Sequence, residues 1–146
     1  VLEFNVRLGD PETQVVLPRI KSDLLDVFQA MTAGSLSGSK IEWSEDATVC
    51  VVIASGGYPG SYTTGKEISG LDMVEEDSDT VVFHAGTSLK KSITITSGGR
   101  VLGVTSQAPN LRKAILKAYE GVNKIHFEGM HYRRDIAAKG LKKEIK

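Results

Sequence analysis

Apolar residues recur along the second half of the chain with two different periods. Four segments have the short period of β-strands and are separated by Gly-rich turns: 47–54, 80–84, 92–96 and 100–105. Between about Asn110 and Ile125 the apolar residues instead recur every three or four positions, which is typical of a helix that buries one stripe. We therefore predict a small, mostly antiparallel sheet with one long helix packed against it.

The first residues alternate apolar and polar side chains over Val1–Val6, which predicts a strand. In such a strand Leu2, Phe4 and Val6 would point into the core, and the polar residues between them would share the other face. Because the chain opens on Val inside this pattern, we expect it to begin within a larger polypeptide.

Two helices are predicted to follow. Asp10 can cap the first and Pro11 suits its first position, while Pro18 keeps it short. Ser22 is the predicted cap of the second helix, which carries an apolar face and ends at Gly34. Together with the later strands, these helices predict the α+β class.

A Ser/Gly-rich segment, Ser35–Lys40, separates the helical part from the strands and predicts a domain boundary. We expect one unit over residues 1–40, a second over 41–136, and a basic tail or linker over 137–146. The lysine-rich tail is expected to be a solvated helix or the start of a linker.

Charge and composition exclude several functions. The 18 basic residues balance the 18 acidic ones, so we expect no nucleic-acid partner. The longest apolar run is far shorter than the roughly 20 residues that a membrane-spanning helix needs, and we expect no signal peptide and no membrane contact. Cys50 is the single cysteine, lies between apolar residues, and favours a buried thiol in a cytoplasmic protein.

Glu3 and Asn5 are the first candidates for chemistry. Residues two apart in a strand project from one face, so this carboxylate and amide could together hold a magnesium ion. From spacing alone, a solvated polar face of the strand is the more common explanation.

Arg7 and Asp10 follow on the predicted turn. Arg7 could bind a carboxylate or phosphoryl oxygen, and Asp10 could accept a hydrogen bond from a cationic amine. The alternative is that Asp10, Pro11 and Glu12 only cap the helix, with Arg7 as their surface ion-pair partner.

The segment Leu2–Gln14, which reads LEFNVRLGDPETQ, closely resembles the identifying segment of the glycinamide ribonucleotide synthetase family of de novo purine synthesis. The resemblance continues in order to about Ile136, through the further segments 54–60, 82–87, 98–102, and 127–129 together with 132–136. The chain is therefore similar to the C-terminal portion of that family, which belongs to the ATP-grasp superfamily.

This resemblance implies a ligase that uses ATP to activate glycine as glycyl phosphate, which the amine of 5-phosphoribosylamine then attacks. Glu3 and Asn5 would bind magnesium or manganese, and Arg7 and Asp10 would line the substrate pocket. Residues 1–40 would be the end of the ATP-grasp domain, followed by a small domain of the rudiment single hybrid motif type. The partners would be ATP, both substrates and the preceding domains.

The resemblance also implies that these residues lack the substrate domain and the lid, so the chain alone is expected to be inactive. Two alternatives stay open: another ATP-grasp ligase or carboxylase, and a non-catalytic interaction module. The 55–60 loop lacks the spacing of a phosphate-binding loop and is expected to be a tight turn that closes on the neighbouring domain. Arg100 could reach a carboxylate of that domain.

Overall fold

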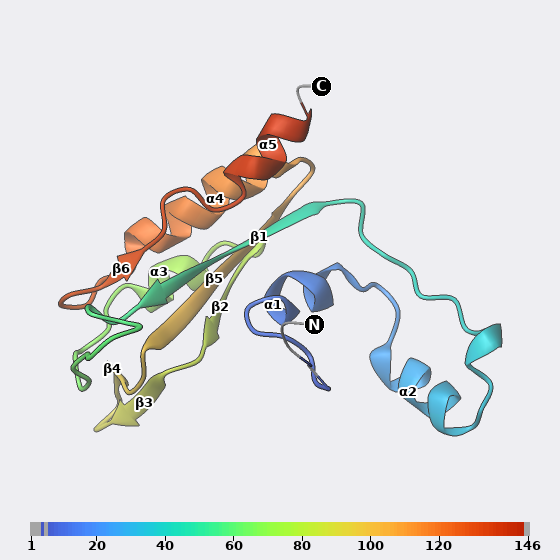
Figure 1. The fold of residues 1–146 in the computed structure, drawn as a ribbon, viewed down its shortest axis with the longest axis horizontal. Coiled ribbons are helices and arrows are strands. Elements are labelled where there is room, and N and C mark those ends of the chain that lie inside the picture. The colour runs from blue at the N-terminus through green and yellow to red at the C-terminus, as the bar shows by residue number, and fades with distance from the viewer. Residues whose placement is uncertain (1–3, 5, 145–146) are drawn as a thin grey trace.

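A four-stranded antiparallel sheet forms the centre of the computed structural model, which describes residues 4 and 6–144 (Figure 1). Its strands lie in the order β2 (Thr80–His84), β5 (Arg100–Ala108), β1 (Ala47–Ala54) and β6 (His131–Tyr132). A separate hairpin pairs β3 (Thr87–Lys90) with β4 (Ile93–Thr96). The predicted α+β class with a mostly antiparallel sheet is confirmed.

The two faces of β1 have different neighbours. Val49, Val51 and Ile53 are buried in the main core, on the face covered by helix α4 (Leu111–Lys124). Cys50 and Val52 point to the opposite face, because successive residues of a strand alternate. That opposite face is the one that the N-terminal helix α1 contacts.

Helix α4 follows the prediction closely. The Asn110 side chain accepts a hydrogen bond from the main-chain N–H of Lys113 at 2.9 Å and so caps the helix. The small or branched residues Ala114, Ala118 and Val122 are fully buried against the sheet. Among the described residues, no helix has both the length and the apolar character needed to cross a membrane.

A β-bulge interrupts the pairing of β1 with β5. Ile53 lies opposite Leu102, but its neighbour Ala54 lies opposite Arg100, so Val101 has no partner of its own on β1. One extra residue in a strand moves the following side chains to the other face of the sheet. Arg100 therefore projects from the face that carries α1 rather than from the α4 face.

The first helix, α1 (Thr13–Val16), begins later than predicted and continues into the 3₁₀ turn η1 (Leu17–Arg19). Glu12 occupies the cap position without a side-chain hydrogen bond, so the predicted start at Asp10 and Pro11 is wrong. The physical reason is that the Asp10 carboxylate contacts Gln14 and Arg100 instead of the main chain of α1.

Helix α2 (Leu24–Thr32) begins one residue later than expected and is followed by the 3₁₀ turn η2 (Leu36–Gly38). The Asp23 carboxylate caps it by accepting from the Leu25 N–H at 2.8 Å. The predicted cap, Ser22, instead accepts from the Glu42 N–H at 2.7 Å, and so ties the linking segment to the start of α2.

The predicted strand Val1–Val6 lies mostly outside the described residues. Phe4 is 85% exposed and Val6 is fully exposed, so the expectation that they point into the core is wrong in this structure. Neither residue lies in a strand, and a strand buries a face only where it packs on a neighbouring element.

Two further short helices complete the fold, and only the first of them was not predicted. Helix α3 (Leu71–Glu75) packs on β2 and α4, and helix α5 (Ala138–Glu144) packs on α4. The expectation of a helix within the tail is thus confirmed, although α5 contacts α4 rather than standing free in solvent.

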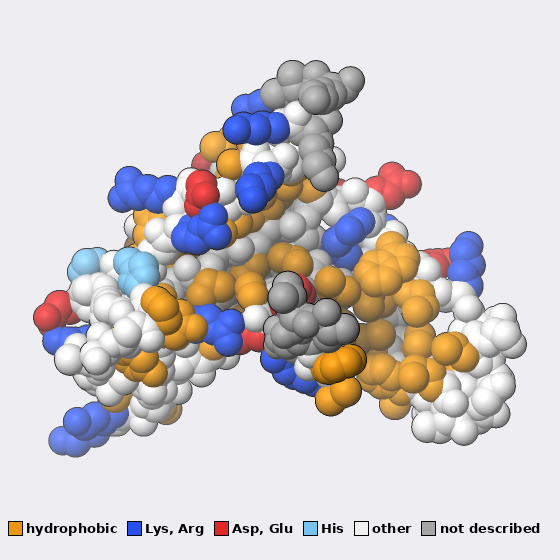
Figure 2. Space-filling model, viewed as in Figure 1, with side chains coloured by type: hydrophobic (Ala, Val, Ile, Leu, Met, Phe, Trp, Pro, Cys, Tyr) orange, Lys and Arg blue, Asp and Glu red, His pale blue; other side chains and the backbone are white. Residues whose placement is uncertain are grey.

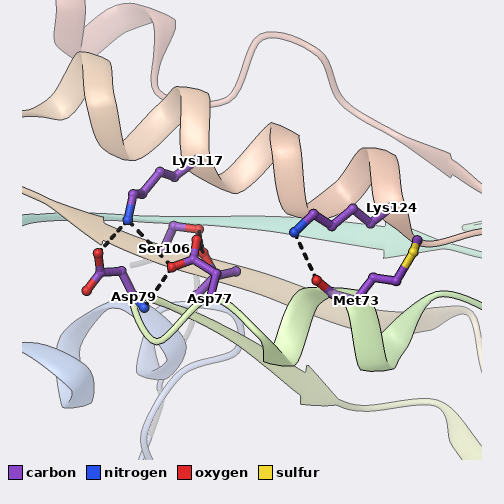
Figure 3. A network of polar contacts seen from close by, with 7 residues as sticks. Met73, Asp77, Asp79, Ser106, Lys117 and Lys124 are labelled. Carbon is purple, nitrogen blue, oxygen red and sulfur yellow. Dashed lines mark hydrogen bonds and ion pairs between the residues drawn. The ribbon is translucent and has the colours of Figure 1, made fainter.

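Polar contacts attach α4 to the turn before β2 (Figure 3). The Lys117 ammonium lies 3.6 Å from Asp77 Oδ1 and also pairs with the Asp79 carboxylate. Asp77 accepts from the Asp79 N–H at 3.0 Å and from the Thr80 hydroxyl at 3.0 Å, and that hydroxyl lies 2.8 Å from the hydroxyl of Ser106.

These contacts shift two pKa values. The hydrogen bond from the Asp79 main chain is the largest cause that lowers the pKa of Asp77, and the hydrogen bond to the Asp79 carboxylate raises the pKa of Lys117.

Candidate functional site at the turn before α1

Arg7 lies on the turn that precedes α1, with its side chain exposed to solvent. Its guanidinium donates to the main-chain oxygen of Leu8 at 2.9 Å, and it forms no ion pair with any residue that the structure describes. The surface ion pair with Asp10 or Glu12, considered above as the alternative, is therefore not formed. A cation without a counter-ion among the described residues can bind an anionic group.

Asp10 contacts the sheet through Arg100. The Arg100 Nη2 atom lies 3.1 Å from Asp10 Oδ2, and Nη1 donates to the Asp10 main-chain oxygen at 3.0 Å. The two residues are 90 positions apart in the sequence, so this contact joins the N-terminal turn to β5. Arg100 thus reaches a carboxylate of the N-terminal segment, and the predicted division of the chain at residue 40 stays a prediction.

Gln14 is a contributor that the sequence analysis missed. Its Nε2 atom donates to Asp10 Oδ1 at 2.9 Å, and its Cγ atom lies 3.9 Å from where a Cβ atom would be at Gly103. Residues four apart meet on one side of a helical turn, so the Asp10 to Gln14 spacing was the available signal.

A cavity of about 360 Å³ lies beside this turn. Pro11, Cys50 and Val52 contribute apolar side chains to its lining, and Arg100 also lines it. The end of β1, the loop after it and the segment that includes β6 supply the other lining residues: Ala54, Tyr58, Pro59, His131, Tyr132, Arg133 and Ile136. The turn and the sheet face therefore enclose a space large enough for a small molecule or a segment of chain.

Glu3 and Asn5, the predicted metal ligands, lie outside the described residues. Within the part of the chain that the structure describes, no cluster of three or more His, Cys, Asp or Glu side chains is arranged to hold a metal. The assignment of Glu3 and Asn5 stays a prediction.

The glycines of the 55–60 loop have a geometric role. A side chain at Gly56 would come within 2.6 Å of the Gly129 carbonyl oxygen, and Gly57 has a φ of +95°. Ser55 joins this loop to the β4–β5 turn, since its hydroxyl donates to the Gly98 oxygen at 2.8 Å. No helix follows the loop directly, so the rejection of a phosphate-binding loop is supported.

Cys50, Glu128 and Arg133 have contacts that indicate structural roles within the described residues. Burial raises the pKa of the Cys50 thiol, which keeps it protonated and a poor nucleophile. Glu128 pairs with Lys66, and Arg133 pairs with Asp135, so neither fastens the sheet to the N-terminal segment.

Known proteins resemble this chain over most of its length. The chain is 50% identical over 141 residues to the phosphoribosylamine–glycine ligase of Halalkalibacterium halodurans, which covers 97% of this chain and 32% of that protein. It is 51% identical to the trifunctional purine biosynthetic protein adenosine-3 of Gallus gallus, over 97% of this chain and 14% of that protein. A crystal structure of the Thermotoga maritima phosphoribosylamine–glycine ligase matches with a TM-score of 0.71 and 37% identity, over 92% of this chain and 32% of the other.

The chain thus spans about a third of the length of its single-function relatives. The sequence model described as "Phosphoribosylglycinamide synthetase, C domain" matches residues 48–139, which include β1 through the start of α5. The chain therefore belongs to the phosphoribosylglycinamide synthetase family.

Proposed function

We propose that the whole protein containing this chain is an ATP-dependent ligase that joins glycine to 5-phosphoribosylamine. In the proposed reaction a glycine carboxylate oxygen attacks the γ-phosphate of ATP, which releases ADP and leaves glycyl phosphate. The amine then attacks the activated carbonyl, the amide bond forms and phosphate leaves. The observation that carries this proposal is the 50% identity to a named ligase of this reaction over 97% of the chain.

Within that reaction, we assign the N-terminal turn to the phosphates and the acyl group. Arg7 supplies an exposed cation with no ion-pair partner in the described residues, which suits a phosphoryl or carboxylate oxygen. Asp10 is held by two intramolecular donors and keeps further lone pairs for a substrate amine. Phosphoryl transfer depends mostly on positioning and charge neutralisation, which these groups can provide.

Glu3 and Asn5 are the proposed ligands of a magnesium or manganese ion. A carboxylate and an amide oxygen suit such a hard cation, which neutralises charge on the nucleotide phosphates when bound. The described residues offer no competing cluster of His, Cys, Asp or Glu.

Exposed apolar residues on α2 support a larger protein around this chain. Val27 alone of that helix is buried, whereas Leu25, Phe28 and Met31 are exposed, as is Trp43 beyond it. Figure 2 shows hydrophobic side chains gathered over this region. A contiguous apolar surface of this kind is typical of an interface, and we propose that residues preceding this chain in the whole protein cover it.

Residues 1–40 would then be the end of an ATP-grasp domain and residues 41–136 the small C-terminal domain, with 137–146 as tail. The chain alone would be inactive, because the cleft that closes on ATP needs the preceding domains. A cytoplasmic location is proposed with this function, and the protonated thiol of Cys50 is compatible with it.

The test is a steady-state assay of the whole protein with ATP, magnesium, glycine and 5-phosphoribosylamine. We expect ADP release that requires both substrates, and a product with the mass of the amide. Glu3→Gln keeps the side-chain volume but removes the ligand charge, so it should abolish most turnover at limiting magnesium. Glu76→Gln, at an exposed glutamate, is the matched control and should turn over normally.

ADP release without a requirement for the amine would point to another ATP-grasp ligase or carboxylase. A whole protein that binds neither ATP nor substrates would favour a non-catalytic interaction module. Normal activity of Glu3→Gln at limiting magnesium would remove Glu3 from the metal site while leaving the ligase function intact.

A further inference from the structure

Three donor groups contact Asp10, two at its side-chain carboxylate and one at its main-chain oxygen. Gln14 donates to Oδ1 at 2.9 Å, and Arg100 pairs with Oδ2 at 3.1 Å. The second guanidinium nitrogen of Arg100 donates to the Asp10 carbonyl at 3.0 Å. Arg100 thus contacts both the carboxylate and the main chain of Asp10. Two contacts fix the orientation of the turn, whereas one contact would allow it to rotate.

The position of Arg100 itself depends on the fold of the C-terminal part. The bulge at Val101 turns its side chain to the α1 face, as described above. The preceding turn is braced, because the Ser55 N–H donates to the Gly99 carbonyl at 2.8 Å and the Tyr58 ring occupies the space where Gly99 has no side chain. The guanidinium is therefore presented from a rigid strand rather than from a loose loop.

Stability is a poor explanation for this contact. The side chains of Arg100 and Asp10 are 42% and 40% exposed, and ion pairs that exposed contribute little to the free energy of unfolding. The same exposure leaves the Asp10 carboxylate open on its solvent side. The contact constrains the direction of the turn that carries Arg7 and Asp10 more than it stabilises the fold.

We infer that Arg100 is a positioning residue of the ligase, which holds the turn of Arg7 and Asp10 in the orientation that the substrates require. The inference rests on the proposed function and assigns the C-terminal sheet a part in the reaction geometry. Arg100 touches no substrate in this proposal and acts through Asp10.

The experiment compares Arg100→Gln, Arg100→Lys, Asp10→Asn and the Asp10→Asn/Arg100→Gln double variant of the whole protein. We expect Arg100→Gln to lower kcat by about 10- to 100-fold, the scale of a small misplacement of reacting groups, with an unchanged melting temperature. Arg100→Lys should recover part of the rate, since it keeps the charge but makes only point contacts. The double variant should be no slower than Asp10→Asn alone, because Arg100 acts through that residue.

The matched control is Lys66→Gln, which breaks the 2.7 Å ion pair to Glu128 and should leave kcat unchanged. Amide hydrogen exchange of residues 8–14 supplies a readout that does not depend on activity, and it should accelerate in Arg100→Gln.

Unchanged kcat in Arg100→Gln, or losses that multiply fully in the double variant, would overturn the positioning role. If Arg100→Gln does not fold, full activity of Arg100→Lys together with unchanged exchange would overturn it as well. An inactive wild-type protein would contradict the ligase function itself. In that case, unchanged amide hydrogen exchange of residues 8–14 in Arg100→Gln would show that the contact between Arg100 and Asp10 does not constrain the turn. Faster exchange would show that it does.

Discussion

Gly121 of α4 lies against Val104 of β5 so closely that a side chain on the glycine would come within 2.9 Å of the valine Cγ1 atom. The same side chain would lie 3.3 Å from Thr80 Cγ2. Glycine inside a helix costs about 1 kcal/mol relative to alanine, and here it allows the helix to approach the sheet.

We predict that Gly121→Ala lowers the stability of the chain despite the better helix propensity of alanine. Overpacking a well-filled core costs roughly 1–3 kcal/mol, which exceeds the gain of about 1 kcal/mol in the helix. Urea unfolding followed by circular dichroism measures the difference. Glu120→Ala, at the adjacent exposed position, should shift the midpoint little, and a Gly121→Ala protein at least as stable as wild type would contradict the close packing.

We predict that the folded chain loses stability in acid as Asp77 becomes protonated. Its pKa is lowered from 3.8, first by the hydrogen bond from the Asp79 main chain, so its contribution is present above the unfolded-state pKa and disappears as pH falls through the lower folded-state pKa. In unfolding midpoints measured between about pH 2 and pH 7, Asp77→Asn should be less stable than wild type near neutrality. The two curves should converge at the acid end, and a constant gap at every pH would count against this linkage.

Arg7→Lys should reduce turnover of the whole protein, because a guanidinium can bind two oxygens at once where an ammonium offers a point charge. Steady-state kinetics with each substrate varied in turn checks this, with Lys21→Arg at an exposed position as the control. Unchanged kcat and unchanged KM for glycine, ATP and 5-phosphoribosylamine would leave Arg7 as a surface residue without a part in the reaction.

The isolated chain should bind ATP with magnesium too weakly for calorimetric titration to detect at micromolar concentrations. A nucleotide site buries most of its ligand between converging surfaces, and under the proposed function this chain would supply only one side of such a cleft. A lone carboxylate and amide leave magnesium largely hydrated. Binding near one molecule per chain with micromolar affinity would mean that a complete site lies within these residues.

The exposed apolar residues of α2 should make the isolated chain self-associate. Leu25→Gln/Phe28→Gln removes apolar surface from the exposed side of the helix, and should lower both the apparent mass by light scattering and the binding of a hydrophobic dye. In the whole protein the same variant should reduce stability, since the residues would be covered there. Identical dye binding by the wild-type and variant chains would argue against an interface on α2.

Local patterns were sufficient for the elements whose stability depends on neighbours in sequence. The apolar spacing of α4 predicted that helix, and the apolar run of 47–54 predicted β1. The residue types at Arg7 and Asp10 likewise indicated a polar turn suited to anions and amines. The period of apolar residues is a short-range pattern that can be read from a few adjacent residues. The caps were less predictable, since Asp10 and Ser22 do not cap the helices that they were expected to cap.

The tertiary structure alone decided which of these groups meet. Strict alternation would place Arg100 on the face of Leu102 and Val104, beneath α4, and only the bulge at Val101 turns it toward Asp10. That contact in turn removes the Asp10 carboxylate from the helix cap and moves the start of α1 to Thr13. Bulges and contacts between residues 90 positions apart arise from the packing of whole elements. A pattern of neighbouring residues therefore does not predict them.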